Sequence, residues 1–570
     1  MRTEQFIDCE KIKNLKNGIK QAYQKDYVKI VTVFLFFFFV FSIIQFSIAN
    51  LPSTDDPLFH IRFAEIIKEK GLESFRDFPW LHFSKITENQ KYFIYYNFLF
   101  YSIVIPFTFI KPLFLGIKLY GAIFGSLSFV VLYGLLLKWK EKKAFLWMLV
   151  LFSVIYYTSL WRLLMMRPFT LAPAILGALI YFAYRKKYGM IFFLSVIYFY
   201  WHTATFFFPV FVVGTYFLFE KFYGEKFDWK MVASSLGGTL AAFLAMLLFA
   251  PGLFYYMKDI IFGVLYDTII GKKIGIAEGL ELTPSNVFSF ISSFTIFFIL
   301  LAISSIYEIF RYIQEKKDGF FYFQEESDQK RSLRGTLFFL SLFFLLATFL
   351  SGRNGDFFVF FSALYLVIGI NFILKNIRFE NILIKKSAYA GLLIIMAYLF
   401  IANIFLVRNR IAASPPYDRF EAVGTWLKNN AQKGEVIFNT NWGWFTELFY
   451  YDSDNYYIAG IEPRFFYDYD PKLYWLWWHI SNNGFICYEE NCGEIFKLQA
   501  ANLKNDERKK IWYNKQGNLI ADAVKNNFQS RHIVISKGYT NLIDVMDNNP
   551  RFEKVFEEQV YKEFFIYKLK

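Results

Sequence analysis

Apolar runs long enough to cross a lipid bilayer recur along this chain from about residue 30 to residue 407. The first reads "IVTVFLFFFFVFSIIQFSIA" (30–49), and short charged interruptions separate the runs that follow. A helix that crosses the hydrocarbon core needs about 20 apolar residues, so each run has roughly the length of one span. After Val407 the sequence becomes mixed and polar. We therefore predict a polytopic helical membrane domain over 30–407 and a water-soluble domain over 408–570.

The net charge of +14 comes from lysines and arginines that gather in the N-terminal segment and in short loops between the runs. This is the pattern of the positive-inside rule, so we predict a cytoplasmic segment 1–29 and no nucleic-acid partner. Placing every basic loop inside gives eleven spans, in a range of about eleven to thirteen, and an odd number leaves the C-terminal domain outside. The spans are predicted at 30–50, 113–137, 144–160, 169–184, 189–202, 203–220, 231–254, 287–312, 336–350, 357–374 and 386–407. The stretch 94–112 is either a further span or a helix on the outer leaflet.

Unusual polar residues of the membrane domain concentrate in the segments that this topology puts outside. The largest such segment is a first external loop over 51–112. Ionisable residues at a membrane are costly, and a cluster of them on one face indicates a functional site. The residues are Asp55, Asp56, His60, Arg62, Arg162, Arg167, Glu278, Glu281, Arg353 and Asp356.

The stretch "STDDPLFHIRFAEIIKEKG" (53–71) opens the first external loop. A structural reading makes Asp56 the N-cap of a helix with Pro57 at its first position, where the missing N–H costs nothing. Gly71 then ends the helix. This reading leaves Asp55 and His60 unexplained, so a helix cap and an active site both stay open.

The stretch "DDPLFHIRFAEIIKEKGLESFRDFPW" resembles the first external loop of the catalytic subunits of oligosaccharyltransferases, which are membrane glycosyltransferases of the GT-C type. The resemblance implies a GT-C fold followed by an extracytoplasmic α/β domain, and an inverting transfer of sugar from a lipid-linked donor. It places Asp56 in the catalytic centre as a metal ligand that also helps to engage the acceptor.

Three further stretches are similar to the same family in the same order. "IGIAEGLELTPSNVFSF" (274–290) offers Glu278 as the matching carboxylate, and hence as a second metal ligand. "FLSGRNGDFFVFFSALYLVIGI" (349–370) offers Arg353 as the arginine that meets the lipid-linked phosphate. The segment 414–460 resembles the start of the family's soluble domain.

The chain also departs from the family pattern. The Trp-Trp-Asp signature reads Asn439-Thr440-Asn441 here, and the external loop around 161–168 has arginines where a second acidic motif is expected. A divalent metal, Mg²⁺ or Mn²⁺, prefers several oxygen ligands. Asp56 and Glu278 alone would make a sparse site, so a metal-dependent and a metal-free reaction both stay open.

The chemistry of these residues is coherent in its own right. Asp56 or Asp55 can orient the attacking nucleophile as a base, with Glu278 as a further catalytic carboxylate. Arginines can meet the charge that grows on a leaving phosphate. The predicted donor-phosphate residues are Arg353, Arg167 and Arg162, and the predicted acceptor-binding residues are Asn441, Trp442 and His60.

The C-terminal domain alternates helix-like and strand-like segments, which predicts an α/β module. Its short strands are expected at "EVIFNT" and "YYIAG", and "RHIVISKG" followed by "FEKVFEEQVYKEFFIYKL" is expected to be rich in strands. Cys487 and Cys492 could form a disulfide in an oxidising compartment or remain free thiols.

These observations favour an enzyme of the plasma membrane whose partners are a polyprenyl-phosphate-linked sugar, membrane lipids, and a protein, glycan or lipid acceptor. Two alternatives of other classes are a non-enzymatic flippase or transporter of lipid-linked sugars, and a scaffold that has lost catalysis. A transporter should carry charges near the membrane midplane and repeated halves, neither of which the sequence displays.

Overall fold

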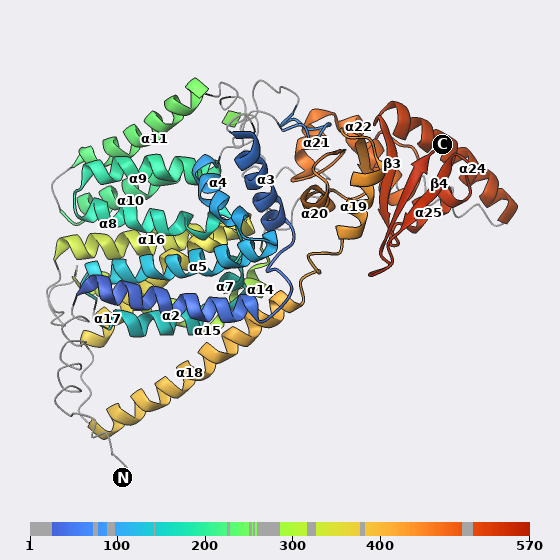
Figure 1. The fold of residues 1–570 in the computed structure, drawn as a ribbon. Coiled ribbons are helices and arrows are strands. Elements are labelled where there is room, and N and C mark those ends of the chain that lie inside the picture. The colour runs from blue at the N-terminus through green and yellow to red at the C-terminus, as the bar shows by residue number, and fades with distance from the viewer. Residues whose placement is uncertain are drawn as a thin grey trace, which may run out of the picture.

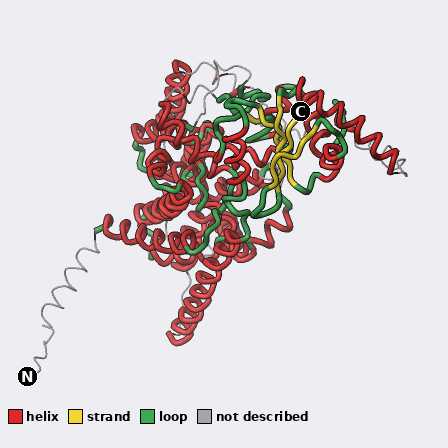
Figure 2. Tube along the Cα trace, turned by 45° about the vertical axis from the view of Figure 1, so that its right-hand side comes forward, coloured by secondary structure: helices red, strands yellow, loops and turns green. Residues whose placement is uncertain are grey.

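A bundle of long helices and a smaller sheet domain make up the computed structural model of this protein (Figure 1). The structure describes residues 25–71, 74, 78–87, 97–141, 143–224, 228–249, 254, 257–258, 285–315, 327–376, 382–492 and 506–570. The bundle helices pack side by side and more than one helix deep, and they are called the layer below; the sheet lies beyond one end of it (Figures 1 and 2). The predicted combination of a polytopic helical part and a smaller α/β part is confirmed.

The helices of the layer run back and forth between its two ends. Most follow the predicted spans closely, because each apolar run is bounded by charged or polar residues. They are α2 (Asp26–Phe46), α5 (Leu113–Lys138), α6 (Ala144–Val154), α7 (Tyr157–Leu163), α8 (Ala172–Tyr184), α9 (Tyr188–Trp201), α10 (Phe208–Phe222), α11 (Trp229–Phe249), α14 (Val287–Ser293), α15 (Thr295–Glu315), α16 (Asp328–Leu350), α17 (Gly355–Asn376) and α18 (Ile382–Ala412).

In the described part of the chain, seven helices are long and apolar enough to cross a membrane, and nine if each of two bent pairs counts as one span. This is the architecture of a multi-pass membrane protein. The two remaining predicted spans are α8 and α9, apolar helices of 13 and 14 residues. At 1.5 Å per residue they are shorter than a bilayer core. The count of eleven spans stays a prediction.

The bent pair α6–α7 ends the layer on the side of the sheet domain. The chain bends by 109° between the two helices. This bend leaves the last carbonyls of α6 without helical partners. Asn403 of α18 supplies them, donating to Phe152 O at 2.7 Å and to Ile155 O at 3.0 Å. Because lipid offers no hydrogen bonds, a break within an apolar segment needs such side-chain partners.

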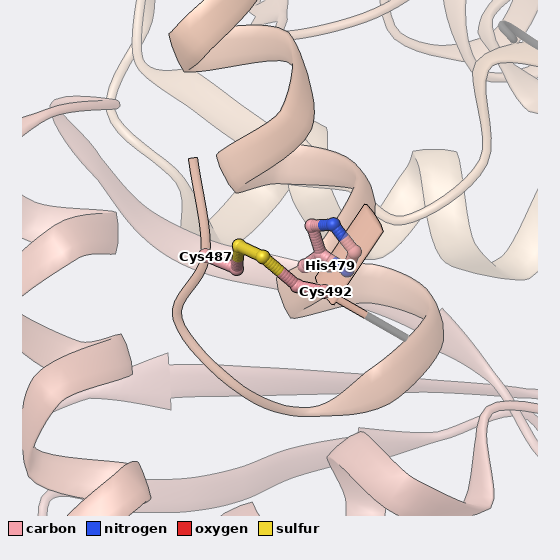
Figure 3. Close-up of side chains that lie close together, drawn as sticks. All are labelled: His479, Cys487 and Cys492. Carbon is pink, nitrogen blue, oxygen red and sulfur yellow. A yellow bond between two sulfur atoms is a disulfide. The ribbon is translucent and has the colours of Figure 1, made fainter. Parts of the chain in front are cut away.

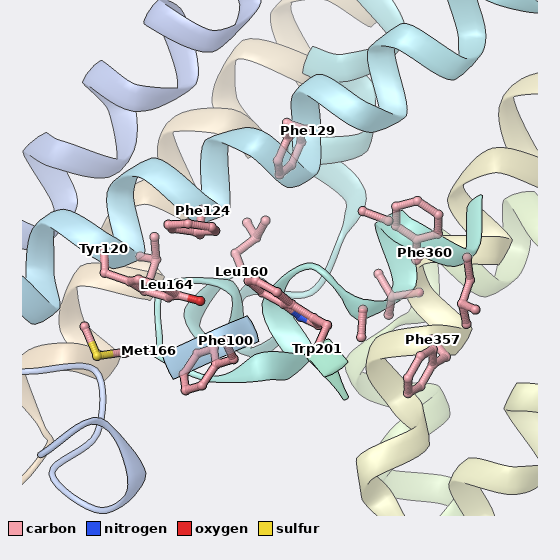
Figure 4. Close-up of a cluster of buried hydrophobic side chains, with 14 of the residues drawn as sticks. Phe100, Tyr120, Phe124, Phe129, Leu160, Leu164, Met166, Trp201, Phe357 and Phe360 are labelled. Atoms are coloured by element: carbon pink, nitrogen blue, oxygen red, sulfur yellow. The ribbon is translucent and has the colours of Figure 1, made fainter. Parts of the chain in front are cut away.

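An aromatic cluster lies just inside this end of the layer (Figure 4). Tyr120 stacks on Phe124 with ring centroids 4.2 Å apart, and Trp201 meets Phe100 edge to face at 5.9 Å. The indole N–H of Trp201 donates to Pro168 O at 2.6 Å. The cluster therefore holds the end of α9 against the chain that follows α7.

The predicted external loop over 51–112, called the outer loop below, adds three short elements at this end. These are α3 (Asp56–Lys70), α4 (Phe98–Val104) and the 3₁₀ helix η2 (Ile105–Phe109). α4 and η2 pack against α3, and α4 also contacts α9. The stretch for which the sequence allows either a span or an outer-leaflet helix is thus a pair of short helices at the end of the layer.

The C-terminal part forms a five-stranded sheet in the order β2-β1-β3-β5-β4. β1 pairs in parallel with β2 and β3, while β5 is antiparallel to β3 and β4. The strands are β1 (Val436–Asn439), β2 (Tyr456–Tyr457), β3 (Ser530–Ser536), β4 (Phe552–Glu557) and β5 (Phe564–Leu569). The helices are α19 (Glu421–Asn430), α20 (Phe445–Tyr451), α21 (Pro463–Tyr469), α22 (Pro471–Asn483), α24 (Asp506–Asn526) and α25 (Thr540–Asp547).

Side chains of β3 alternate between the two faces of the sheet, as the strand period of two requires. Ile533 and Ile535 pack with the cluster that includes α22, α24 and α25. Val534 packs with the cluster that includes α19, α20 and the membrane layer. One face of the sheet is thus continuous with the core of the membrane domain.

Helix α3 docks on helix α20, and this contact joins the outer loop to the sheet domain. Phe59 meets Phe449 at 5.4 Å between ring centroids, and Trp80 meets Phe449 at 5.1 Å. The Trp80 indole donates to Ser453 O at 2.7 Å, and Arg62 donates to the Ser453 hydroxyl at 2.9 Å. The loop and the C-terminal domain therefore lie on the same face of the layer.

The outer loop also extends the sheet. Leu81 forms a parallel bridge to Tyr457 at the free edge of β2. The Tyr457 N–H donates to Trp80 O at 2.7 Å, and the His82 N–H donates to Tyr457 O at 3.3 Å. An edge strand carries unpaired backbone groups, which this segment of the loop satisfies.

A buried ion pair completes the junction. Arg419 holds Glu447 through two bonds, Nε–Oε1 at 2.9 Å and Nη2–Oε2 at 2.6 Å. Glu447 has no exposed surface, and Thr54 lies near its carboxylate. Burial raises the pKa of Glu447 to about 7, although Arg419 and Thr54 act to lower it.

Truncating the shared aromatic ring should weaken the junction. Phe449 is fully buried, so Phe449→Ala should cost about 3–5 kcal/mol by removing a packed aromatic side chain. We expect a lower melting temperature of the detergent-purified protein and faster proteolysis within 78–87. Ile511→Ala, at a side chain 67% exposed on α24, is the control and should change neither. Unchanged proteolysis in Phe449→Ala would contradict the docking.

The junction should also respond to pH through Glu447. Its pKa is about 7 in the folded state and 4.5 in the reference state, so the folded state binds more protons between these values. Stability should therefore fall as pH rises from about 5 to about 8, by at most about 3 kcal/mol from this group. Melting temperatures across this range should show a shallower slope in Glu447→Gln than in wild type. Glu553→Gln, on an exposed carboxylate, should keep the wild-type slope, and equal slopes in all three proteins would refute the assignment.

Candidate functional site

The predicted site residues of the outer loop meet the membrane layer where α3 begins. Asp55 stands at the cap position of α3 and its side chain makes no capping hydrogen bond. Asp56 is the first residue of the helix, so the expectation that Asp56 is its N-cap is wrong. Its carboxylate instead forms an ion pair with Arg167, with Oδ2 2.8 Å from Nε. The structure thus joins a predicted catalytic residue to a predicted phosphate-binding residue.

Arg167 owes its place to the bend between α6 and α7. The chain returns from this bend through an extended Arg167 into the 3₁₀ helix η3 (Pro168–Thr170). The Leu164 carbonyl accepts a hydrogen bond from Gln45 of α2 at 3.0 Å. A Cβ at Gly121 of α5 would lie 2.2 Å from that carbonyl oxygen. A glycine is therefore needed there for the chain after α7 to approach α5.

Arg162, on α7, pairs with Asp356 in the first turn of α17. The contact has two bonds, Nε–Oδ1 at 3.0 Å and Nη2–Oδ2 at 2.9 Å. Side-chain exposure is 19% for Arg162 and 17% for Asp356, against 48% for Asp56. The Arg162 pair is therefore shielded, whereas Asp56 is open to water.

Arg353 lies in the 3₁₀ helix η6 (Gly352–Asn354), between α16 and α17. It is partly exposed, and its charge acts on His202 at the end of α9. His202 is buried, with Nδ1 2.6 Å from the Thr205 hydroxyl. All three predicted phosphate-binding arginines therefore stand at the same end of the layer.

A cavity of about 50 Å³ lies beside the Arg162–Asp356 pair, and its walls are otherwise mostly apolar. It has room for one or two water molecules, whereas sites for organic ligands are commonly 300–1,000 Å³. The cavity is too small for a sugar.

His60 lies behind the Asp56–Arg167 pair. It is 6% exposed, and its Nδ1 is 2.6 Å from the Tyr101 hydroxyl. Burial lowers the pKa of His60 to about 4, with Arg167 acting in the same direction and Asp56 opposing both. A neutral, buried imidazole supports the packing of α3 on α4 but gives an acceptor little surface to bind.

Asn441 and Trp442 belong to the sheet domain. Asn441 accepts a hydrogen bond from Gly443 N at 2.8 Å and donates to the Tyr539 hydroxyl at 3.0 Å. Trp442 is partly buried and packs on the domain's own core. Among the interactions of the described residues, none joins these two side chains to Asp56.

A resident divalent metal finds little support among the described residues. Glu278, the predicted second ligand and catalytic carboxylate, lies outside them, as does Glu281. Asp56 already faces an arginine, whose charge disfavours a cation at the same carboxylate. The only group of three metal-binding side chains found in the described chain is His479, Cys487 and Cys492 (Figure 3). Cys487 and Cys492 form a disulfide there, which leaves no thiolates to bind a metal.

The sequence assigns no role to three residues of these contacts, Asp356, Arg419 and Glu447. Asp356 counts among the outer polar residues, but its pairing with Arg162 across 194 positions has no sequence signal. Arg419 and Glu447 look like ordinary charges of a soluble domain. Only the docking of α3 on α20 brings them next to Thr54.

Comparison with known proteins identifies no family for this chain. No protein-family model matches the chain, and no curated protein matches it.

Proposed function

We propose that this protein is an integral-membrane glycosyltransferase of the GT-C type, which transfers a sugar or oligosaccharide from a polyprenyl phosphate or diphosphate to an acceptor on the outer face. The observation that carries the proposal is the half-exposed Asp56 carboxylate, held by Arg167 where the outer loop meets the membrane layer. Arg162 and Arg353 at the same end supply further positive charge. The membrane is a plasma membrane, with the N-terminus cytoplasmic and the sheet domain outside.

Each side chain has a distinct task in this reaction. Asp56 orients the acceptor nucleophile and takes its proton as the nucleophile bonds to the anomeric carbon. The bond from that carbon to the phosphate oxygen breaks on the opposite side, so the configuration inverts. Arg353 and Arg162 meet the negative charge left on the phosphate. Arg167 fixes the orientation of the Asp56 carboxylate, and no step requires a metal.

The different exposure of Asp56 and Arg162 supports placing the acceptor at Asp56 and the donor phosphate at the arginines. Asp56 opens toward water, beside a domain that an acceptor reaches from outside. Arg162 is shielded against α17, at the end of the helices beside which a polyprenyl tail would lie in the bilayer. Charge pairs at the end of the layer favour surface chemistry over a transport path, which needs ionisable groups near the midplane.

The acceptor class is best decided by experiment. Asn439 and Thr440 are buried and bonded to neighbouring backbone, Asn439 Nδ2 to Ala459 O at 2.6 Å and Thr440 Oγ1 to Val534 O at 3.1 Å. These hydrogen bonds hold the backbone of the sheet domain, so the two side chains are not free to bind a peptide acceptor. Protein, glycan and lipid acceptors should therefore all be offered.

The first test is transfer of radiolabelled glycan from polyprenol-linked donor in membranes that carry the protein. We expect Asp56→Asn to lower transfer at least 100-fold, because the nucleophile loses its base. Asp522→Asn, on an aspartate whose side chain is 58% exposed on α24, is the matched control and should transfer normally. Peptides with and without Asn-x-Ser/Thr, total glycans and total lipids serve as acceptors. Wild-type levels of transfer by Asp56→Asn would refute the proposal.

The second test separates donor binding from chemistry. Arg353→Ala should raise the KM for the lipid-linked donor about 10- to 100-fold, since a hydrogen bond to a charged group contributes about 1.5–3 kcal/mol. Arg353→Lys should restore part of the loss by keeping the charge. Arg331→Ala, at the opposite end of α16, is the matched control. An unchanged donor KM in Arg353→Ala would remove Arg353 from the donor site.

A further inference from the structure

A second pocket, outside the site described above, opens on the sheet domain. Its volume is about 470 Å³, within the range of small-molecule sites. It lies between α19 and the β4–β5 hairpin. It is lined by Asp418, Arg419, Glu421, Ala422, Thr425, Trp426, Asn429, Asn430, Phe556, Glu558, Val560 and Tyr561.

Two aromatic residues of this cleft are held in place by the protein. The Trp426 ring meets His532 at 5.6 Å and Phe556 at 5.9 Å between centroids. The Tyr561 hydroxyl donates to Asp418 at 2.6 Å, while the side chain stays 38% exposed. A ligand that packs on these rings would not have to order them first, which lowers the cost of binding.

The charges of the cleft are largely satisfied within the protein. Arg419 pairs with Glu447, and the buried Glu558 carboxylate accepts the backbone N–H groups of Val560 and Tyr561. Thr425, Asn429 and Glu421 present exposed side chains. Hydroxyl and amide groups both donate and accept hydrogen bonds, which suits a ligand rich in hydroxyls. The remaining acidic charge disfavours an anion.

We infer that this cleft binds an uncharged sugar unit. The flat apolar face of a pyranose packs against Trp426, and its hydroxyls meet Thr425, Asn429 and Glu421. Assigning that sugar to the substrate rests on the proposed transferase function, but binding itself does not. The unit belongs either to the acceptor glycan or to the glycan of the lipid-linked donor.

The cleft is also connected, through side chains, to the loop that carries Asp55 and Asp56. Arg419 forms part of its wall and pairs with Glu447, which has Thr54 near its carboxylate. Asp55 also acts electrostatically on Arg419. A sugar bound beside α19 would thus be held by the same element that positions the start of α3.

Binding can be measured without any transfer reaction. The full-length protein in nanodiscs would be applied to an array of uncharged mono- to tetrasaccharides, together with sulfated and sialylated glycans and lysine-rich peptides. The strongest uncharged binder would then be titrated by saturation-transfer NMR. We expect Trp426→Ala to weaken it more than tenfold, Trp426→Phe to restore part of the loss, and Asn429→Ala and Thr425→Ala to weaken it about fivefold each.

The controls separate this inference from the proposed function. Asn548→Ala, at another exposed asparagine, and Asp56→Asn should both bind like wild type. Absence of binding to every uncharged glycan, preference for anionic glycans or for peptides, or full binding by Asn429→Ala and Thr425→Ala would overturn the inference. Retained binding with no transfer by wild type would overturn the transferase proposal and leave the cleft standing.

Kinetics then identify the source of the sugar. With Asn429→Ala, which leaves the Trp426 packing in place, a fivefold rise in acceptor KM assigns the cleft to the acceptor. The same rise in donor KM assigns it to the donor glycan, and kcat should hold in either case. If neither KM changes, the bound sugar is not part of the substrate.

Discussion

The docking of α3 on α20 is the contact on which the rest of the outer site depends. It uses aromatic packing around Phe449, a backbone bridge at Tyr457 and the buried Arg419–Glu447 pair. Each element comes from a part of the chain that could not hold its place alone: α3 is a short amphipathic helix and β2 a strand of two residues. Because the junction is built from both, Asp56 is positioned by a domain that follows it by more than 350 residues.

Charge pairing explains why the arginines of this end can remain at a membrane surface. Taking an arginine out of water is costly unless a carboxylate compensates for it. Arg162 has Asp356 and Arg167 has Asp56, so each cation is desolvated and oriented before any ligand arrives. A phosphate that approached Arg162 would replace one anion by another, which costs less reorganisation than recruiting a free side chain. The same logic makes removal of the Asp356 carboxylate more damaging than its small exposed surface suggests.

The sequence predicts the spans well because lipid imposes a length and a composition on each one. The predicted strand segments likewise contain β1, β2 and β3, since apolar residues there are flanked by turn residues. The ion pairs could not be predicted from the sequence. Nothing local distinguishes Arg162 from an arginine at a helix end, and its partner Asp356 lies 194 positions away. The cap expected at Asp56 failed for a related reason, because a local rule could not foresee that Arg167 would occupy its carboxylate.

The short helices α8 and α9 connect these observations. Neither is long enough to reach both faces of a bilayer, so each is continued at this end by chain that is not α-helical, which carries Arg167 before α8 and His202 after α9. In the proposed function a lipid phosphate would meet Arg353 and Arg162 at this end of the layer, while a water-borne acceptor would meet Asp56 from the side of the sheet domain. Two substrates of opposite solubility would then share one end of the layer, with the Asp56–Arg167 pair at the boundary between them.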